Sequence, residues 1–420
     1  MATQISSIWR GVPNGATRAQ RSPCQFSAYL PDFLVDRPFF LSAKMAADIA
    51  DAEKSISDLQ GQSGGEKNLE GLARLLLRAE AVASSFIEGL HINVKRLAKE
   101  EVAILVGLGS QDETARAVLG NIHAMNEALN IAVSKKKITV ADLCTIHYQL
   151  LQGTDGAAFA GKIREEQNWI GGINPCRAEF VPPPSEQVGE LLEDLCEYIS
   201  GKDHSPLLQA ALAHAQFETI HPFADGNGRT GRTIIHLILK RRGLAPRYVP
   251  PISLLLATHS NMYVSMLGSY RYLGAADSIA AQSGVQNWVD FFSQETLRAA
   301  NDAVDLVCQL NLLEVSWRKR IGRIRKNSSI DQLLQILPSL PVITVETATL
   351  VLGRHVTNVN DAVNELVRVG VLKQTTIGRR NRAFEVTELI KLITHFERAL
   401  GSATGQTHHD PPSRQVPARD

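Results

Sequence analysis

The chain has 420 residues, which is enough for two to four domains that each bury a hydrophobic core. Its 44 Lys and Arg balance 43 Asp and Glu, so nucleic-acid binding would need a local basic patch. No apolar stretch approaches the roughly 18 residues of a membrane span, and the N-terminal segment lacks the apolar core of a signal peptide.

The five cysteines are odd in number, widely spaced and without a C-x-x-C pair. This pattern predicts neither a disulfide framework nor a zinc site, and Cys176 has no evident role. With no leader and no membrane span, we expect a reduced, soluble, cytoplasmic protein. The cysteines are Cys24, Cys144, Cys176, Cys196 and Cys308.

Residues 1–25 are polar and rich in turn formers, and we expect them to be disordered. Apolar residues at spacings of three and four then predict a largely helical chain over residues 26–325. The expected helices are about 42–60, 67–88, 112–133, 139–152, 185–200, 205–220 and 228–242, with further helix between about 252 and 325.

The character of the chain changes from about residue 328. Short helices precede a turn of Gly378, Arg379 and Arg380 that is flanked by strand-forming residues. This order predicts a small helical unit that ends in a hairpin, over residues 328–395. Residues 401–420 are rich in Gly, Ser and Pro, which predicts a disordered tail.

The most informative segment is residues 221–232, with the sequence HPFADGNGRTGR. A glycine-rich turn that enters a helix exposes backbone N–H groups without partners inside the helix, and the helix dipole adds positive potential there. Gly226 and Gly228 allow the backbone to approach a phosphate closely. Arg229 and Arg232 are three residues apart, so both guanidinium groups face one side of the helix start. The segment therefore predicts a phosphate-binding loop.

Two residues of this segment supply reactive groups. Asp225 stands at the lip of the turn, and one carboxylate with phosphate oxygens and water is the usual protein share of a Mg²⁺ site. His221 ends the preceding helix, where a neutral imidazole can take a proton from an incoming hydroxyl. A lone Gly-Asn-Gly or a lone histidine at a helix end is usually structural, but here every position fits one mechanism. The spacing and lysine of a Walker loop are missing.

Residues 221–232 resemble the complete signature of the Fic/DOC family, H-P-F-x-[D/E]-G-N-G-R-x-x-R, with no departure. Residues 167–172 and 180–184 resemble the family's flap, and residues of about 30–115 resemble its N-terminal helical extension. The resemblance thus implies an N-terminal helical region over residues 26–115 and a catalytic domain over residues 116–325. The segment from about residue 328 resembles the winged helix often appended to such proteins. The resemblance implies an all-α protein: a Fic-type helical bundle with a short β-hairpin flap and a small C-terminal winged-helix domain.

The resemblance also implies an activity, the transfer of AMP from ATP to a Ser, Thr or Tyr hydroxyl with release of pyrophosphate. By that resemblance, His221 is the general base and Asp225 the Mg²⁺ ligand. Lysine in place of Gly228 would indicate the phosphotransferase variant of the family, so glycine favours nucleotidyl transfer. The residues implied to bind the nucleotide are Gly226, Asn227, Gly228, Arg229, Thr230, Gly231 and Arg232.

Phe180 and Val181 precede Pro182, Pro183 and Pro184, which forbid a helix and favour extended chain. A short edge strand there could pair with the backbone of a target and present a side-chain hydroxyl without reading the sequence closely. The alternative is a proline-rich connector with no partner.

Ser84 and Glu88 are four residues apart at the end of an expected helix, and Gly89 follows. A carboxylate in a last turn opposes the helix dipole at a cost of about 0.3–1 kcal/mol, which is easier to accept beside a cation. The string resembles the family's inhibitory motif, [S/T]-x-x-x-E-[G/N], which implies that Glu88 pairs with Arg232 and leaves ATP in a nonproductive pose. The alternative is a solvated glutamate before a capping glycine.

Between Arg354 and Arg382, six Lys and Arg stand against two acids, a local charge of +4. A modest basic patch on a winged helix can enter a major groove of DNA. Winged helices serve protein interaction or dimerisation equally, so DNA binding through residues 328–390 and a homodimer both stay open.

We therefore predict a protein adenylyltransferase held in check by Glu88. Its partners would be ATP, an unidentified target protein and the chain itself. Two alternatives use the same site: removal of AMP from modified proteins, and transfer from another nucleotide donor such as UTP. A third, of a different class, is a DNA-binding regulator whose enzymatic core modifies only itself.

Overall fold

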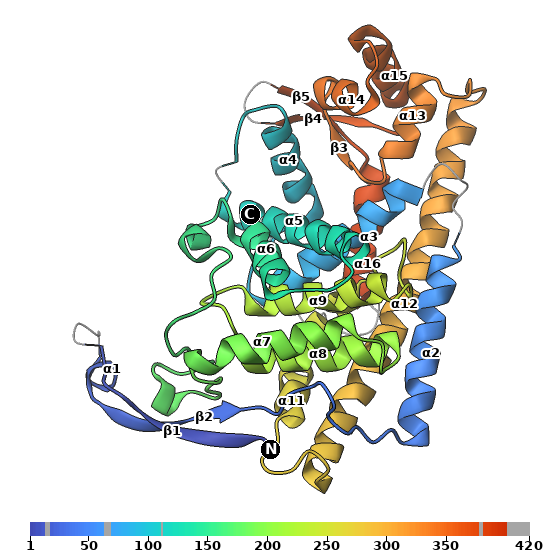
Figure 1. Cartoon of the computed structure of the whole chain (residues 1–420). Helices are drawn as coiled ribbons and strands as arrows, with labels where there is room; N and C mark the ends of the chain where they lie inside the picture. Colours follow the sequence, from blue (N-terminus) through green and yellow to red (C-terminus); the bar gives the residue numbers. More distant parts are fainter. Residues whose placement is uncertain (13–16, 63–68, 111, 378–380, 401–420) are drawn as a thin grey trace. The chain divides into compact units, whose positions relative to one another are not determined.

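A computed structural model of the chain describes residues 1–12, 17–62, 69–110, 112–377 and 381–400. Helices dominate these residues, and the strands form two small antiparallel sheets (Figure 1). The predicted all-α class is confirmed in this mostly helical character. No helix of the described residues combines the length and the apolar composition needed to cross a membrane.

The chain forms two compact units, and the first comprises Met1–Glu53, His123–Leu244 and Asn261–Gln294. Its centre is the pair α8 (Pro206–Ile220) and α9 (Asn227–Arg241), and α8 is buried from Leu207 to its end. Proline occupies the first position of α8, as predicted, because its fixed φ suits that position and its missing N–H would have no acceptor there. The other helices that lie wholly in this unit are α1 (Arg18–Arg21), α6 (Val140–Leu151), η1 (Asp155–Phe159), η2 (Pro175–Arg177) and α7 (Ser185–Ser200).

A β-hairpin forms the N-terminal segment of this unit. β1 (Thr3–Trp9) pairs with β2 (Cys24–Leu30) in antiparallel register, from Thr3 opposite Leu30 to Trp9 opposite Cys24. The prediction that residues 1–25 are disordered is therefore wrong for the described residues of that segment. The strands carry few buried side chains, so no alternation of apolar and polar residues marks them in the sequence.

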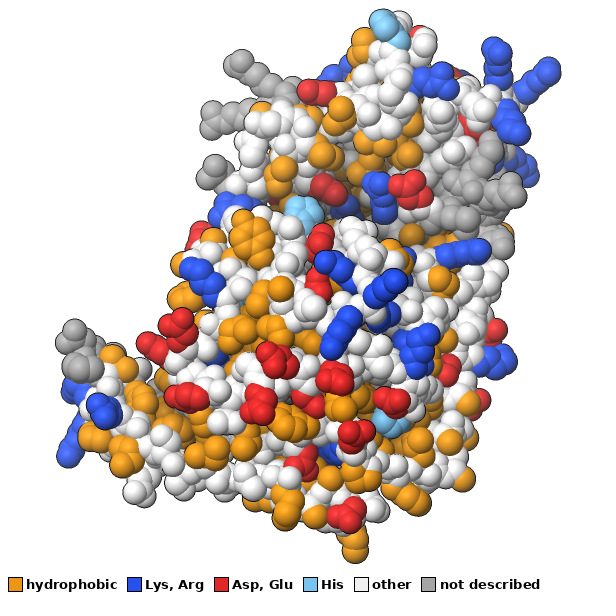
Figure 2. All heavy atoms as spheres, in the orientation of Figure 1, with side chains coloured by type: hydrophobic (Ala, Val, Ile, Leu, Met, Phe, Trp, Pro, Cys, Tyr) orange, Lys and Arg blue, Asp and Glu red, His pale blue; other side chains and the backbone are white. Residues whose placement is uncertain are grey.

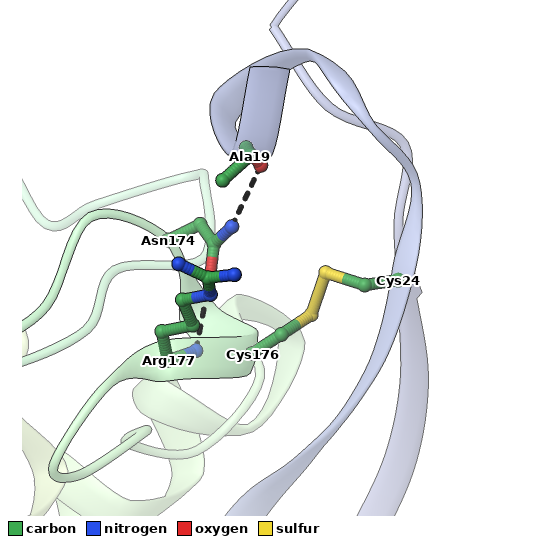
Figure 3. The surroundings of a disulfide bond; sticks show 5 residues. All are labelled: Ala19, Cys24, Asn174, Cys176 and Arg177. Atoms are coloured by element: carbon green, nitrogen blue, oxygen red, sulfur yellow. Dashed lines mark hydrogen bonds between the residues drawn. A yellow bond between two sulfur atoms is a disulfide. The ribbon is translucent and has the colours of Figure 1, made fainter. Parts of the chain in front are cut away.

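A disulfide joins the hairpin to a distant segment of the same unit. Cys24 of β2 is bonded to Cys176 of η2, with their Cα atoms 6.4 Å apart (Figure 3). The prediction that the cysteines form no disulfide framework is wrong for this pair, and Cys176 gains a structural role. The two residues are 152 positions apart, so the fold, and no local spacing, brings them together. Cys144, Cys196 and Cys308 are free thiols.

The second unit comprises Lys54–Ile122, Ala245–Ser260 and Glu295–Asp420. Within it, α3 (Leu69–Ile87) packs against α10 (Ile252–Thr258), and α4 (Val94–Leu105) packs against the C-terminal elements. The buried carboxylate of Glu80 on α3 accepts the backbone N–H of Ser253 at 2.7 Å and its hydroxyl at 2.5 Å. This pair anchors α3 to the start of α10.

The C-terminal elements contain the predicted short helices and hairpin, and their strands form a three-stranded sheet in the order β3-β5-β4. The hairpin does not end the unit as predicted, because the helix α16 follows it. The predicted turn at Gly378, Arg379 and Arg380 and the predicted tail over residues 401–420 lie outside the described residues. Each unit combines segments far apart in the chain, so the linear division at residue 115 does not describe the units. The C-terminal elements are α13 (Ser329–Ile336), β3 (Val342–Ile343), α14 (Val345–Leu352), α15 (Val356–Arg368), β4 (Lys373–Ile377), β5 (Asn381–Glu385) and α16 (Thr387–Leu400). Four helices contribute residues to both units: α2 (Ala43–Gln60), α5 (Glu113–Ser134), α11 (Ser260–Tyr270) and α12 (Ile279–Ile321).

Candidate active site

His221 stands at the carboxyl end of α8, where the helix turns into a loop. Its backbone has φ 49° and ψ 60°, the left-handed conformation that residues with a Cβ rarely adopt. Its N–H donates to the carbonyl of Phe217 at 2.9 Å and closes the last turn. The side chain is 19% exposed, and its Nδ1 lies 3.9 Å from Oε2 of Glu218. The fold thus presents an imidazole at the end of a buried helix, beside a carboxylate.

Asn227 holds the loop that follows in a fixed turn. Its side-chain carbonyl accepts the N–H of Phe223 at 2.9 Å, and its amide donates to the carbonyl of Phe223 at 2.8 Å. Gly226 has φ 76°, and a Cβ there would lie 2.9 Å from the side chain of Leu150, so only glycine fits this close turn. The side chain of Asn227, predicted to bind the nucleotide, is occupied in holding the loop.

The start of α9 provides the predicted anion site. The N-cap residue Gly226 has no side chain that could cap this helix, and the helix dipole favours an anion at its start. Arg229 and Arg232 lie in the first two turns and are 5% and 1% exposed. Charges buried to this degree need anionic or carbonyl partners.

Gly231 allows α8 and α9 to pack closely. A Cβ at this position would lie 2.4 Å from Oε1 of Glu218 and 3.1 Å from Nδ1 of His214. Thr230 beside it is fully buried. The structure therefore gives Gly231 a packing role, and nucleotide binding by Thr230 and Gly231 stays a prediction.

His147 of α6 is a residue of this site that the sequence did not single out. Its ring stacks on that of Phe223 with the centroids 3.7 Å apart. Its Nδ1 accepts the N–H of Gly161 at 3.0 Å, so Nε2 carries the proton and donates to the carbonyl of Asp225 at 2.9 Å. Burial lowers the pKa of His147 to about 4, so the ring is neutral at pH 7 and supports the loop without adding charge.

Arg164 is a second residue that the sequence did not reveal. Its Nε donates to the carbonyl of His221 at 2.9 Å, and its Nη1 donates to that of Glu166 at 3.0 Å. Its Nη2 donates to the carbonyls of Pro183 at 2.5 Å and Ile220 at 3.4 Å. Burial lowers the pKa of Arg164 to about 10, which leaves the side chain charged at pH 7. One guanidinium group thus ties the end of α8 to both ends of the flap.

The flap runs between these two ends and lies beside the candidate base. Asn168 donates its amide to the carbonyls of His221 at 3.2 Å and Phe223 at 3.1 Å. Further along, Ile170 and Phe180 form an antiparallel bridge, as a short hairpin requires. The flap is therefore attached directly to the loop that carries His221.

The predicted docking edge at Phe180 and Val181 needs a correction. Both backbone groups of Phe180 are already bonded to Ile170, and the carbonyl of Val181 accepts the N–H of Tyr29 at 2.9 Å. In the described part of the chain, neither the N–H nor the carbonyl of Trp169 forms a hydrogen bond. The backbone groups of Trp169, on the other side of the Ile170–Phe180 bridge, are thus open, and the prolines after Val181 do not indicate this.

Asp225 suits the lip position predicted for it. Its side chain is 63% exposed, and its Oδ2 lies 3.8 Å from Nη2 of Arg229. Its Oδ1 accepts the N–H of Gly226 at 2.7 Å. The described residues contain no group of three or more His, Cys, Asp or Glu that could hold a metal ion by themselves. A single outward-facing carboxylate fits a Mg²⁺ ion whose other ligands are phosphate oxygens and water.

The predicted inhibitory segment lies at the end of α3 in the second unit. The helix ends at Ile87, and Glu88 occupies the exposed turn that follows. Gly89 has φ 80°, and the N–H of Leu90 donates to the carbonyl of Ser85 at 3.1 Å, which is the glycine-ended helix expected from the sequence. Ser84 is fully buried.

The end of this helix is held by α5. The amide of Asn121 donates to the carbonyl of Ala81 at 2.9 Å and to the hydroxyl of Ser85 at 3.1 Å. The same hydroxyl donates to the carbonyl of Ala81 at 2.8 Å. The turn that carries Glu88 therefore follows a fixed last turn of helix.

These features define a class of protein: a helical bundle in which two buried helices present an imidazole, a carboxylate and an uncapped helix start around one loop. A comparison with known protein families identifies this class. Residues 137–239 match the Fic/DOC family, and residues 46–130 match the Fic/DOC family N-terminal region. The chain carries a Fic/DOC domain preceded by the N-terminal region of that family, which confirms the resemblance seen in the sequence.

Curated relatives are named as protein adenylyltransferases. The chain is 24% identical over 245 residues to Protein adenylyltransferase fic-1 of Caenorhabditis elegans, a match that covers 56% of this chain and 46% of the relative. It is 30% identical over 145 residues to Protein adenylyltransferase Fic of Drosophila melanogaster, covering 34% of this chain and 28% of the relative. The chain thus spans less than half the length of these two relatives.

Among solved structures, a Fic family protein from Desulfovibrio desulfuricans G20 has a TM-score of 0.49 and 21% identity, covering 84% of this chain and 98% of that one. A Fic-1 structure from C. elegans has a TM-score of 0.49 and 19% identity, covering 64% of this chain and 74% of that one. At these values the likeness carries no argument about function.

Proposed function

We propose that this chain is a protein adenylyltransferase that transfers AMP from ATP to a Ser, Thr or Tyr hydroxyl of a target protein. The observation that carries the proposal is the loop between α8 and α9, with His221 at one end and an uncapped helix start at the other. The names of the curated relatives support the same activity.

The reaction would proceed by attack on the α-phosphorus. The target hydroxyl forms a new P–O bond, its proton passes to Nε2 or Nδ1 of His221, and the bond between the α-phosphorus and the bridging oxygen breaks to release pyrophosphate. The N–H groups at the start of α9 and the guanidinium groups of Arg229 and Arg232 would bind the triphosphate. A Mg²⁺ ion held by Asp225 would neutralise phosphate charge when bound.

The target would present its hydroxyl by pairing with the flap. The open backbone groups of Trp169 can hydrogen-bond to an extended segment of another protein, which fixes position without reading side chains closely. Asn168, the neighbouring residue, is bonded to the carbonyl of His221. An extended segment on this edge would therefore be held next to the base.

Glu88 would act as an inhibitory residue. We propose that its carboxylate pairs with Arg232, because a bidentate pair would use the donors that ATP needs for its terminal phosphate. The fixed helix end before Glu88 supports this role, since a carboxylate on a held turn loses less entropy on pairing than one on a loose chain. Ser84 would help to hold that end.

The alternative functions at this site differ in the nucleotide donor or in the direction of the reaction. The same loop could hydrolyse AMP from a modified protein or use another nucleotide donor, whereas the relatives' names favour adenylyl transfer. Those names give no support to a DNA-binding regulator that modifies only itself. DNA binding or dimerisation through residues 328–390 and self-modification stay proposals, each open to a direct binding or labelling assay.

A cytoplasmic location also stays a proposal, and the Cys24–Cys176 disulfide weighs against it. Reducing compartments keep most protein thiols reduced, so a structural disulfide favours an oxidising one. Thiol counting on protein purified without reductant separates the two: three free cysteines if the bond forms, as in the structure, and more if it does not.

Labelled ATP tests the activity. We expect label from α-labelled ATP, and none from γ-labelled ATP, to become attached to protein in a Mg²⁺-dependent manner when the chain is incubated with a cell lysate. Transfer of the γ-label would instead indicate a kinase. Equal transfer in EDTA would show that the metal assignment to Asp225 is wrong.

A further inference from the structure

The β1–β2 hairpin is attached to the flap, and nothing in the proposed chemistry uses it. Besides the disulfide, the amide of Asn174 donates to the carbonyl of Ala19 at 2.8 Å (Figure 3). The rings of Trp9 and Trp169 meet edge to face with centroids 6.2 Å apart. The hairpin is thus joined to the residue that carries the open backbone groups of the flap.

The hairpin has a distinctive surface. Residues 1–31 contain three arginines and no Asp or Glu. Arg10, Arg18 and Arg21 are all exposed. Ile8 and Val12 are also exposed, at 64% and 49%. Figure 2 shows the visible face of this arm in blue and orange, with no red near its far end.

An arm of this kind has too little core to be stable alone, because an isolated two-stranded hairpin is marginal in water. The disulfide, the paired tryptophans and the hydrogen bond from Tyr29 to Val181 supply the stability from the flap side. A tethered, cationic and partly apolar strand pair is suited to bind another chain rather than to stabilise its own unit.

We propose that the β1–β2 hairpin is a second docking element for the target, and that it binds an acidic, extended segment flanking the modified hydroxyl. This inference rests on the proposed function, since it extends the flap edge at Trp169. Arginine favours carboxylates through its planar fork of donors, and the absence of acids on residues 1–31 leaves no competing charge within that segment. The disulfide fixes the arm relative to the flap, so one target segment can contact both.

Peptide binding without nucleotide tests this directly. The probes are two fluorescent peptides of about 12 residues with one central Thr, one carrying four Glu and the other four Lys at the same flanking positions. We expect the full chain to bind the Glu peptide at least about five-fold more tightly, the size expected of two exposed ion pairs, and to lose the difference near 0.5 M NaCl.

Three variants sharpen the test. R10E/R18E should reverse the preference, whereas K136E/K137E, an equal charge change at exposed lysines before α6, should leave it intact. C24S/C176S should reduce binding of the Glu peptide several-fold while ATP binding is unchanged. Circular dichroism checks that each variant is folded.

Several results would overturn the proposal: equal binding of both peptides, a preference that survives R10E/R18E, or binding of a short single-stranded oligonucleotide in place of the Glu peptide. The assay contains no ATP, so it separates the two proposals. Charge-selective binding without AMP transfer would remove the proposed function and leave the docking arm in place.

Discussion

The loop between α8 and α9 and the flap lie in the same unit and share Arg164, yet they are built in opposite ways. The loop is framed by two helices whose residues are almost all buried, and Asn227 and His147 fix its backbone. The flap and its hairpin have few buried residues and depend on a disulfide, a bridge and ring contacts. Reactive groups thus stand on rigid elements, while the parts that would meet a target are extended chain.

Replacing His221 should give the largest effect. In His221→Asn, the general base is lost, and we expect transfer from α-labelled ATP to fall by about 10²–10⁴-fold. Asparagine tolerates the left-handed backbone of this position, so ATP binding and the urea midpoint should stay close to those of the wild type. His123→Asn, at an exposed position on α5, is the control. Near-native transfer by His221→Asn would show that another group takes the proton.

Replacing Glu88 should change activity in the opposite direction. If Glu88 occupies Arg232, Glu88→Gly should raise target labelling and self-labelling at least about ten-fold, as expected for loss of a charge-assisted pair worth about 1.5–3 kcal/mol. Ser84→Ala should do less, because it alters only the buried helix end. Glu70→Gln, at an exposed position of the same helix, should have no effect.

Labelling is measured over a range of ATP concentrations, because the pair should compete with the terminal phosphate. No increase at any ATP concentration would remove the inhibitory role and leave Glu88 as an exposed residue after a helix. Replacing Arg232 together with Glu88 should abolish the increase in labelling. The increase depends on an arginine released from Glu88, and the double variant has no such arginine.

Arg164 tests the link between the two regions. In Arg164→Met, four backbone carbonyls lose a buried donor, and we expect a loss of stability of about 1–3 kcal/mol in urea unfolding. Arg164→Lys keeps the charge but lacks the planar fork, so it should restore stability only in part.

The kinetic signature of Arg164 should separate positioning from general support. Under conditions where both variants are folded, we expect the KM for a protein target to rise and kcat to fall, with ATP binding little changed. The reason is that Arg164 bonds to both ends of the flap and to the carbonyl of His221. An unchanged target KM would reduce Arg164 to a structural role.

Much of this site follows from the sequence. The segment 221–232 combines a base, a carboxylate, glycines and arginines at local spacings, and local spacing is what a sequence displays. The helix boundaries were predictable for the same reason: apolar periodicity, proline at the start of α8 and glycine after α3 are features of neighbouring residues.

The remaining parts depend on contacts between distant residues. Arg164 and His147 lie far from residue 221 in the chain. Both donate to backbone carbonyls, which every residue has, so the sequence does not show which residues are their partners. The Cys24–Cys176 pair spans 152 positions, and the hairpin strands have too few buried side chains to set an alternating pattern. The prolines near Phe180 indicated an extended chain correctly, but not which edge was already paired.

The last prediction concerns the neutral histidine under the loop, His147, and the pH dependence of stability. The pKa of His147 is about 4 in the folded chain because burial disfavours its charge, whereas an unfolded histidine has a pKa of about 6.5. Between these values the unfolded chain binds more protons, so the free energy of unfolding should fall as the pH drops from about 6.5 to about 4. The full shift corresponds to about 3 kcal/mol. The contribution is complete above pH 6.5, where both states are neutral.

Urea unfolding at a series of pH values between 7 and 4.5 measures this dependence. His214 contributes in the same direction, since burial lowers its pKa to about 3. His147→Gln should therefore reduce the slope of the unfolding free energy against pH by the contribution of one proton, about 1.4 kcal/mol per pH unit near pH 5. The contribution of His214 to that slope should remain. His395→Gln, at an exposed position of α16, should leave the slope unchanged. If His147→Gln kept the wild-type slope, His147 would be protonated in the folded chain, and its Nδ1 could not accept the N–H of Gly161.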